Sequence, residues 1–182
     1  MADDLIAVVE SEHAHIQDLF DRVSQPDEDR RDVFKRLLLE LSAHVGAEKR
    51  VVRPALDDGV DGGDELARGL GEDHDEIERL ITLLERRKVN SPDVPDLANE
   101  LLAVVDRHVE RSGALLSALR TALDDGQLDE LGAAMQGDDA KLLTHPHPHL
   151  PDTGPLAKLT RGAAALVDRT RDSSADVGRS AT

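Results

Sequence analysis

Residues 5–23 read LIAVVESEHAHIQDLFDRV, and the apolar residues of this stretch recur every three or four positions. That spacing is typical of an α-helix with one face packed on a core. His13 falls in the one gap of the apolar series, between Val9 and Ile16, so we expect its ring to point inward. His15 comes two positions later, which turns it by about 200° around the helix, and we place it on the solvent face.

Three further segments show the same periodicity, and clusters of Pro, Gly, Asp and Asn separate them. Short connections between long helices imply antiparallel neighbours. We therefore predict an all-α fold, an antiparallel up-down four-helix bundle with a short C-terminal helical extension. The predicted helices run through residues 4–24, from 29 to between 54 and 63, 64–88, and 95–125.

Each of the other three predicted helices also places a histidine on its apolar stripe. His44 and Glu48 lie one turn apart on the buried face of the second helix. His74 belongs to the stripe of the third helix, with Glu78 one turn later at its edge, and His108 belongs to the stripe of the fourth. The bundle is thus expected to hold four interior histidines, one from each helix.

The chain also repeats itself. Glu12-His13-x-x-Ile-x-x-Leu in the first segment matches Asp73-His74-x-x-Ile-x-x-Leu in the third. His44 in the second segment and the fourth-helix histidine occupy corresponding places. The bundle is therefore interpreted as two helical hairpins of common design.

Composition limits the possible function. Cysteine is absent, so any metal must be held by nitrogen and oxygen ligands. The N-terminus lacks the pattern of a secretion signal, and no stretch approaches the ~20 apolar residues needed to span a bilayer, so we expect a cytoplasmic protein without a membrane partner. The net charge of -16 would repel phosphate backbones, and with Phe20 and Phe34 as the only aromatic residues there is no platform for stacking bases. We expect no nucleic-acid partner.

Buried imidazoles need a physical reason. A lone histidine on an apolar face is more often a satisfied core residue than a ligand, but burying four unpaired rings costs roughly 1 to 3 kcal/mol each. A shared cation removes that cost, and imidazole with carboxylate suits Fe, Mn, Zn or Co. The pattern therefore predicts a metal site inside the bundle.

The order of these residues resembles the hemerythrin HHE cation-binding domain over about residues 1–125. The motif is His13, then His44-x-x-x-Glu48 followed by a Val-x-Pro-x-Leu run, then a His-x-x-x-Glu and a final histidine. The resemblance implies a non-haem iron site of one or two Fe ions, with Glu48 as the candidate bridge. The metal ligands it implies are His13, His44, Glu48, His74, Glu78 and His108.

Two positions depart from the family pattern. The carboxylate that usually follows the fourth-helix histidine by one turn is Ser112, and the usual second Glu after Glu48 is Lys49. Glu110 faces the opposite side of its helix. A second metal ion is then loosely held, replaced by water or absent.

Residues 126–171 form the predicted C-terminal extension: a short helix, an extended Pro/His segment at 144–152 and a short helix at 155–171. Residues 172–182 are expected to be a disordered tail. The HPHPH segment resembles the extension of certain bacterial members of the family. It is interpreted as a rigid spacer, with two alternatives, a metal-binding tract or a ligand that replaces the missing carboxylate. The histidines concerned are His145, His147 and His149.

On this resemblance the leading hypothesis is a non-haem iron protein that binds or senses O2, NO or peroxide, small ligands that are its expected partners. Catalase-like or oxidase-like di-iron activity is implied as an option, and the oligomeric state stays open. The alternative is a helical interaction or structural protein with a degenerate, metal-poor site, which Lys49, Ser112 and Gly113 favour.

Overall fold

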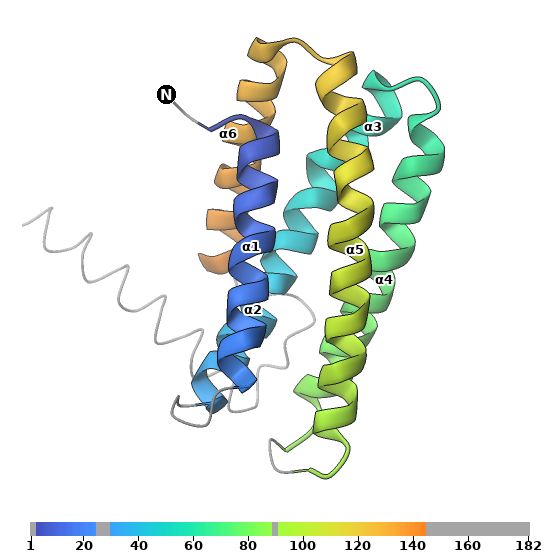
Figure 1. Cartoon of the computed structure of the whole chain (residues 1–182). Coiled ribbons are helices and arrows are strands. Elements are labelled where there is room, and N and C mark those ends of the chain that lie inside the picture. The colour runs from blue at the N-terminus through green and yellow to red at the C-terminus, as the bar shows by residue number, and fades with distance from the viewer. Residues whose placement is uncertain (1–2, 25–29, 89–90, 145–182) are drawn as a thin grey trace, which may run out of the picture. The chain divides into compact units, whose positions relative to one another are not determined.

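The computed structural model describes residues 3–24, 30–88 and 91–144, and all regular structure within these ranges is helical. Figure 1 shows the long helices lying side by side. The six helices are α1 (Leu5–Ser24), α2 (Arg30–Arg50), α3 (Val52–Gly59), α4 (Gly63–Glu85), α5 (Val94–Ala122) and α6 (Asp125–Thr144).

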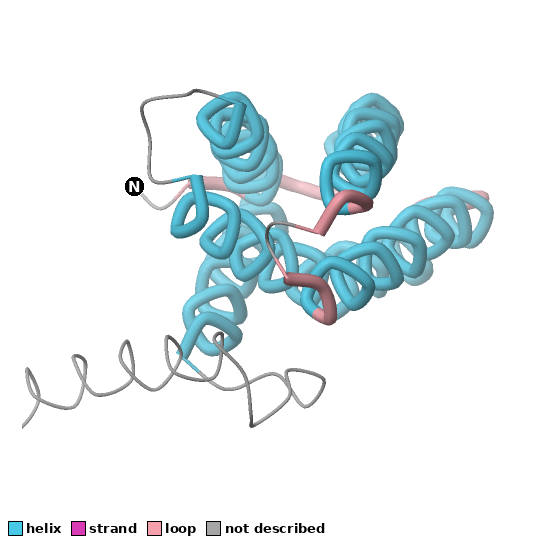
Figure 2. Tube along the Cα trace, turned by 90° about the horizontal axis from the view of Figure 1, so that it is seen from below, coloured by secondary structure: helices cyan, strands magenta, loops and turns pink. Residues whose placement is uncertain are grey.

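The bundle consists of α1, α2, α4 and α5. Consecutive members run in opposite directions (Figure 1), and α1 packs on α2 while α4 packs on α5. The two hairpins meet through α2 with α4 and α1 with α5. Figure 2 gives the view from below, coloured by secondary structure, and no strand occurs among the described residues. The predicted all-α four-helix bundle is confirmed.

The second predicted helix is divided in two. Helix α2 ends at Arg50, and α3 begins at Val52 after a break at Val51. Pro54 explains the break, because its missing N–H cannot bond the carbonyl of Arg50, while its fixed φ suits the first turn of a new helix. The third and fourth predicted helices agree with α4 and α5 to within a few residues.

An aliphatic core fills the bundle on one side of the histidines. On each long helix the core residue next to the histidine lies one turn away on the same face, namely Ile16, Leu41, Ile77 and Val105, and all four are buried. Phe20 and Phe34 belong to the same cluster. The helices are therefore held in register by apolar packing directly beside the histidines.

Helix α6 packs against the start of α1. A side chain at Gly132 would run into the backbone of Asp3 and Leu5, so this close approach requires glycine. Leu128 and Met135 are buried on the same helix. The short helix predicted after residue 126 is thus present and longer than expected.

The chain divides into two compact units, Met1–Asp139 and Ala140–Thr182. The Pro/His segment from residue 145, the predicted helix at 155–171 and the tail at 172–182 lie outside the described residues. Within the described ranges, no helix has both the length and the apolar character that crossing a membrane requires.

Candidate metal centre

Five buried polar side chains meet in the interior of the bundle. His13 comes from α1, His44 and Glu48 from α2, His74 from α4 and His108 from α5, and none is more than 5% exposed. One ligand atom from each of His13, His44, Glu48 and His108 lies within 4.8 Å of all the others. The structure therefore brings together five of the six predicted ligand residues.

The carboxylate of Glu48 lies among the ring nitrogens. Its Oε2 is 2.7 Å from His74 Nε2 and 3.3 Å from His108 Nε2. Its Oε1 is 3.7 Å from His13 Nε2 and 3.6 Å from His44 Nε2. Each histidine thus directs Nε2 toward the same carboxylate.

The spacing of the ring nitrogens suits a common ion. His13 Nε2 and His108 Nε2 are 3.1 Å apart. Two nitrogens bound at about 2.1 Å to one metal at a right angle lie about 3 Å from each other. The rings of His13 and His44 meet edge to face, with centroids 4.7 Å apart, so their nitrogens approach without the rings clashing.

The protonation states also suit a cation. Burial, together with the charge of His44, lowers the pKa of His13 to about 3, and burial lowers the pKa of His74. Burial acts to raise the pKa of Glu48, but His44 and His108 outweigh it, and the pKa lies well below its ordinary value. At neutral pH the cluster therefore holds an anionic carboxylate beside the neutral imidazoles of His13 and His74, whose lone pairs are available to a metal.

His108 differs from His13 and His74. Burial acts to lower its pKa, but the charge of Glu48, the hydrogen bond to Glu48 and the charge of Asp73 together outweigh burial, and the pKa of His108 is raised. Nδ1 of His108 and Nδ1 of His74 are buried without a hydrogen-bond partner. The donors that meet at the cluster are instead the Nε2 atoms and the Glu48 carboxylate, a set that suits a metal ion. The residues present therefore fit a metal ion held by nitrogen and oxygen.

The profile of the Hemerythrin HHE cation binding domain matches residues 4–117, well over half of the chain. The chain belongs to the hemerythrin HHE cation-binding domain family. A solved HHE cation binding domain-containing protein from Mycobacterium kansasii has a similar fold, with a TM-score of 0.67 and 23% identity over 77% of this chain and 87% of that one. A Nostoc protein named DNA nickase is 22% identical over 138 residues; the match covers 74% of this chain, which spans only 39% of that relative's length.

Glu78 lies apart from the cluster of this HHE domain. Its side chain is 49% exposed, and it is 2.8 Å from Lys49 Nζ in an ion pair that joins α2 to α4. His15 is exposed and bonded to Glu40 at 2.6 Å, which confirms its predicted position on the solvent face. Ser112 is buried and donates to the backbone carbonyl of His108 at 2.9 Å.

Glu12 supports the cluster from outside, a role that sequence reasoning missed. His44 Nδ1 donates to Glu12 Oε2 at 2.8 Å, and this bond leaves Nε2 of His44 to face Glu48 as the ligand atom. The sequence feature that could have indicated this role is the Glu12-His13 pair, with which the internal repeat begins.

Asp73 is a second residue that sequence reasoning missed. Its carboxylate is 1% exposed and accepts from Arg107 Nε at 2.8 Å and from Arg111 Nη1 at 3.0 Å. These bonds join α4 to α5. Asp73 occupies the place that Glu12 has in the other copy of the repeat, so the repeat could have indicated this residue too.

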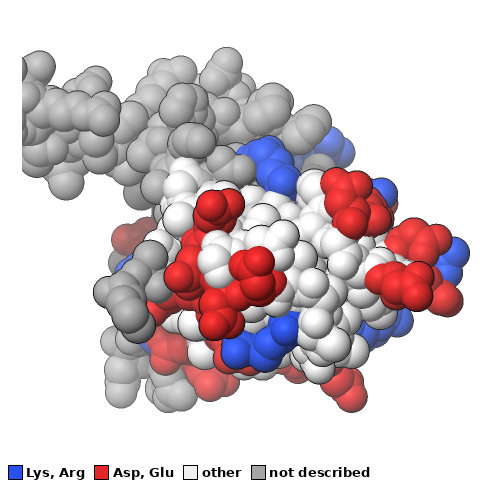
Figure 3. Space-filling view, turned by 90° about the horizontal axis from the view of Figure 1, so that it is seen from above, with Lys and Arg blue, Asp and Glu red and all other residues white. Residues whose placement is uncertain are grey.

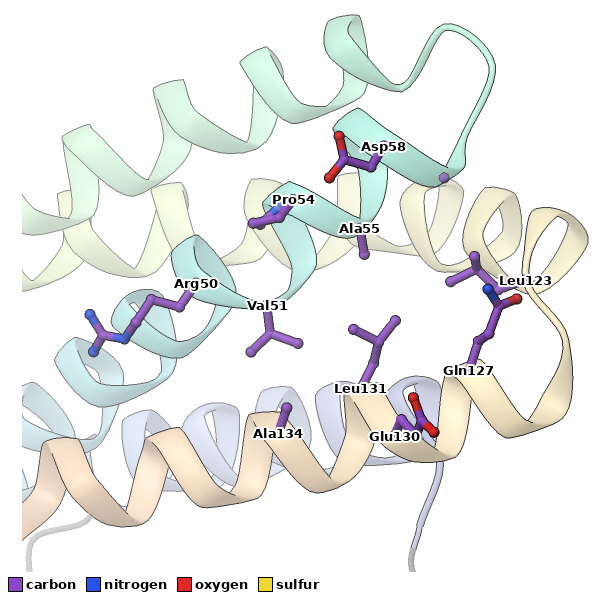
Figure 4. Close-up of a pocket in the computed structure, with 11 residues that line it drawn as sticks. Arg50, Val51, Pro54, Ala55, Asp58, Leu123, Gln127, Glu130, Leu131 and Ala134 are labelled. Atoms are coloured by element: carbon purple, nitrogen blue, oxygen red, sulfur yellow. The ribbon is translucent and has the colours of Figure 1, made fainter.

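An open groove of about 570 Å³ lies between α3 and α6 (Figure 4). Val51 and Leu131 point toward each other across it, and Ala55 and Ala134 complete its apolar lining. None of the clustered histidines nor Glu48 lines the groove. It is therefore separate from the candidate metal centre.

Proposed function

We propose that this HHE domain binds one iron ion per chain and uses it to bind or sense O2, NO or peroxide. The observation that carries the proposal is the convergence of three imidazole Nε2 atoms and a carboxylate, all buried, around a common point. Iron is among the metals that such a nitrogen and oxygen donor set suits.

In this proposal His13, His44 and His108 would hold the ion through Nε2, and Glu48 would supply an oxygen. His74 would orient Glu48 through their 2.7 Å hydrogen bond. Four protein ligands leave positions for an exogenous ligand in an octahedral arrangement. Bound iron supplies the redox and ligand-binding chemistry, and the chain's own apolar residues limit the access of water.

A single ion is favoured by the difference between the two hairpins. The first hairpin supplies Glu48 one turn after His44, whereas the second has Ser112 at the corresponding place after His108. The hydroxyl of Ser112 is bonded to the helix backbone. The second hairpin therefore lacks the carboxylate that a second ion would need.

The acidic surface supports loading with a cation. The net charge is -16, and Figure 3 shows clusters of acidic side chains on the end viewed from above, with fewer basic ones between them. Such a surface attracts divalent cations and repels anions.

Mixing experiments on protein loaded anaerobically with Fe(II) test the function. We expect the optical spectrum to change on addition of NO, O2 or hydrogen peroxide, and the peroxide sample also reports any catalase-like turnover. Glu48→Gln removes the anionic ligand, so it should abolish iron retention and the spectral change. The matched control is Glu78→Gln, an exposed glutamate that also faces α2 and should behave as the wild type.

An unchanged spectrum with all three reagents, despite bound iron, would contradict the proposed ligand binding. Equal loss of iron in the Glu48→Gln and Glu78→Gln proteins would contradict the assignment of ligands.

A further inference from the structure

The corresponding carboxylates of the two hairpins, Glu12 and Asp73, have different hydrogen-bond partners. In the first, Glu12 on α1 accepts a 2.8 Å hydrogen bond from His44 on α2. By the internal repeat, the equivalent bond in the second hairpin would join Asp73 on α4 to His108 on α5. That bond is not made, and Nδ1 of His108 is buried without a hydrogen-bond partner.

The cause lies in two positions beside the histidine. The residues one before and three after the histidine are Ala43 and Ala47 in α2, and Arg107 and Arg111 in α5. The alanines carry no donor that could compete for a carboxylate. The arginines do, and both bind Asp73, at 2.8 and 3.0 Å.

The carboxylate is nevertheless close to the histidine. Arg107 directly precedes His108 and Arg111 lies one turn later, so a carboxylate bonded to both lies along the turn of α5 that carries His108. Asp73 is almost completely buried there, at 1% exposure. A change of its side-chain rotamer is the movement that would exchange one set of donors for the other.

We propose that Asp73 is a positioning residue for His108, and that Arg107 and Arg111 hold its carboxylate away from Nδ1 and so weaken His108 as a metal ligand. This inference rests on the proposed metal function. Hydrogen bonds from a ligating histidine to a carboxylate fix the ring and raise its basicity, and such partners change metal affinity by about 10-fold to 100-fold. The two hairpins would therefore supply histidine ligands of unequal strength.

Nitrogen-15 NMR of the histidine side chains, on protein without metal, tests the exchange of partners. In the wild type, His44 should show the downfield proton of an Nδ1–H bonded to a carboxylate, and His108 should not. The double variant Arg107→Ala/Arg111→Ala reproduces the alanines of the first hairpin, so we expect a second downfield proton, from His108. Adding Asp73→Ala, which leaves no acceptor, should remove that proton; its persistence, or its absence from the double variant, overturns the inference.

Calorimetric titration with Zn(II) tests the consequence for affinity. The double variant should bind zinc about 10-fold more tightly than the wild type. Removing two positive charges also favours a cation, and Asp73→Ala removes a negative charge, so the decisive comparison is the effect of Asp73→Ala in two backgrounds: it should weaken zinc binding more in the double variant than in the wild type. An equal effect of Asp73→Ala in the two backgrounds contradicts the positioning role. Arg53→Ala/Arg68→Ala, which removes two exposed arginines elsewhere, should leave affinity near the wild-type value.

A fallback variant and the metal-free NMR spectra separate a failure of the positioning role from a failure of the proposed metal function. If the double variant does not fold, Arg111→Gln alone should still release part of the carboxylate and give a weaker downfield signal from His108. Failure of every variant to bind zinc would contradict the proposed function, while the NMR signals of metal-free protein would still decide whether the arginines hold Asp73.

Discussion

Burial controls the protonation of Glu85, which lies at the end of α4, away from the metal centre. Burial raises the pKa of Glu85 to about 7, and Arg86 only partly opposes it. The folded chain therefore holds this proton more tightly than the unfolded chain, so between pH about 4.5 and about 7 stability falls as the pH rises.

Glu85→Gln should remove this pH dependence. We expect the variant to be more stable than the wild type at pH 8, because no buried charge forms, and similar to it at pH 4. Urea unfolding across this range measures the free energy of unfolding directly. Glu72→Gln, at an exposed position on the same helix, serves as the control. A stability difference between Glu85→Gln and the wild type that does not change with pH would contradict the assignment.

Sequence periodicity located the residues of the cluster but not their partners. His13, His44, Glu48 and the other two histidines interrupt apolar stripes, and that position alone indicates an inward ring. Glu12 and Asp73 lie beside the stripes, and their roles depend on donors from a neighbouring helix. Glu78 shows the opposite case, since its spacing suited a ligand but Lys49 holds it at the surface.

At the scale of helices, the long elements follow from their apolar period, and the differences lie at local breaks. The division between α2 and α3 depends on Pro54. In a sequence, a proline that starts a new helix looks the same as a proline that kinks a continuous one, so the apolar period did not reveal the division. Helix α6 carries few apolar residues in a weak pattern, and its close approach at Gly132 to the start of α1 is a contact that the sequence does not display.

Two glycines in helices should respond oppositely to alanine. Gly132→Ala should destabilise the protein by about 1 to 3 kcal/mol, because its new methyl group meets the backbone of Leu5 at 2.8 Å and that of Asp3. Gly113→Ala in α5 meets nothing within 4 Å and should stabilise by about 0.5 to 1 kcal/mol. Thermal unfolding of both variants measures the effects. A stable Gly132→Ala protein would contradict the close packing of α6 on α1.

At the scale of the whole molecule, the metal centre depends on the register of four helices. A period fixes which face of each helix is buried, but it does not fix how far one helix slides along another. Apolar packing sets that register here: Ile16, Leu41, Ile77 and Val105 lie one turn from the four histidines on the same side. The expectation that the rings meet came from the cost of burying four imidazoles and from the family resemblance, because the period alone does not fix the register.

The roles predicted for the histidines of the Pro/His segment remain predictions. These histidines lie outside the described residues, and the cluster draws its ligand atoms from α1, α2 and α5, with His74 of α4 bonded to Glu48. Among the residues that the structure describes, the bundle supplies every ligand of the proposed site.

Anomalous diffraction at the iron edge, from crystals of the full chain loaded with Fe(II), tests the central claim most directly. We predict one peak per chain at about 2.0 to 2.3 Å from Nε2 of His13, His44 and His108 and from an oxygen of Glu48. No peak at that point, or an iron ion bound only by surface carboxylates, would contradict it.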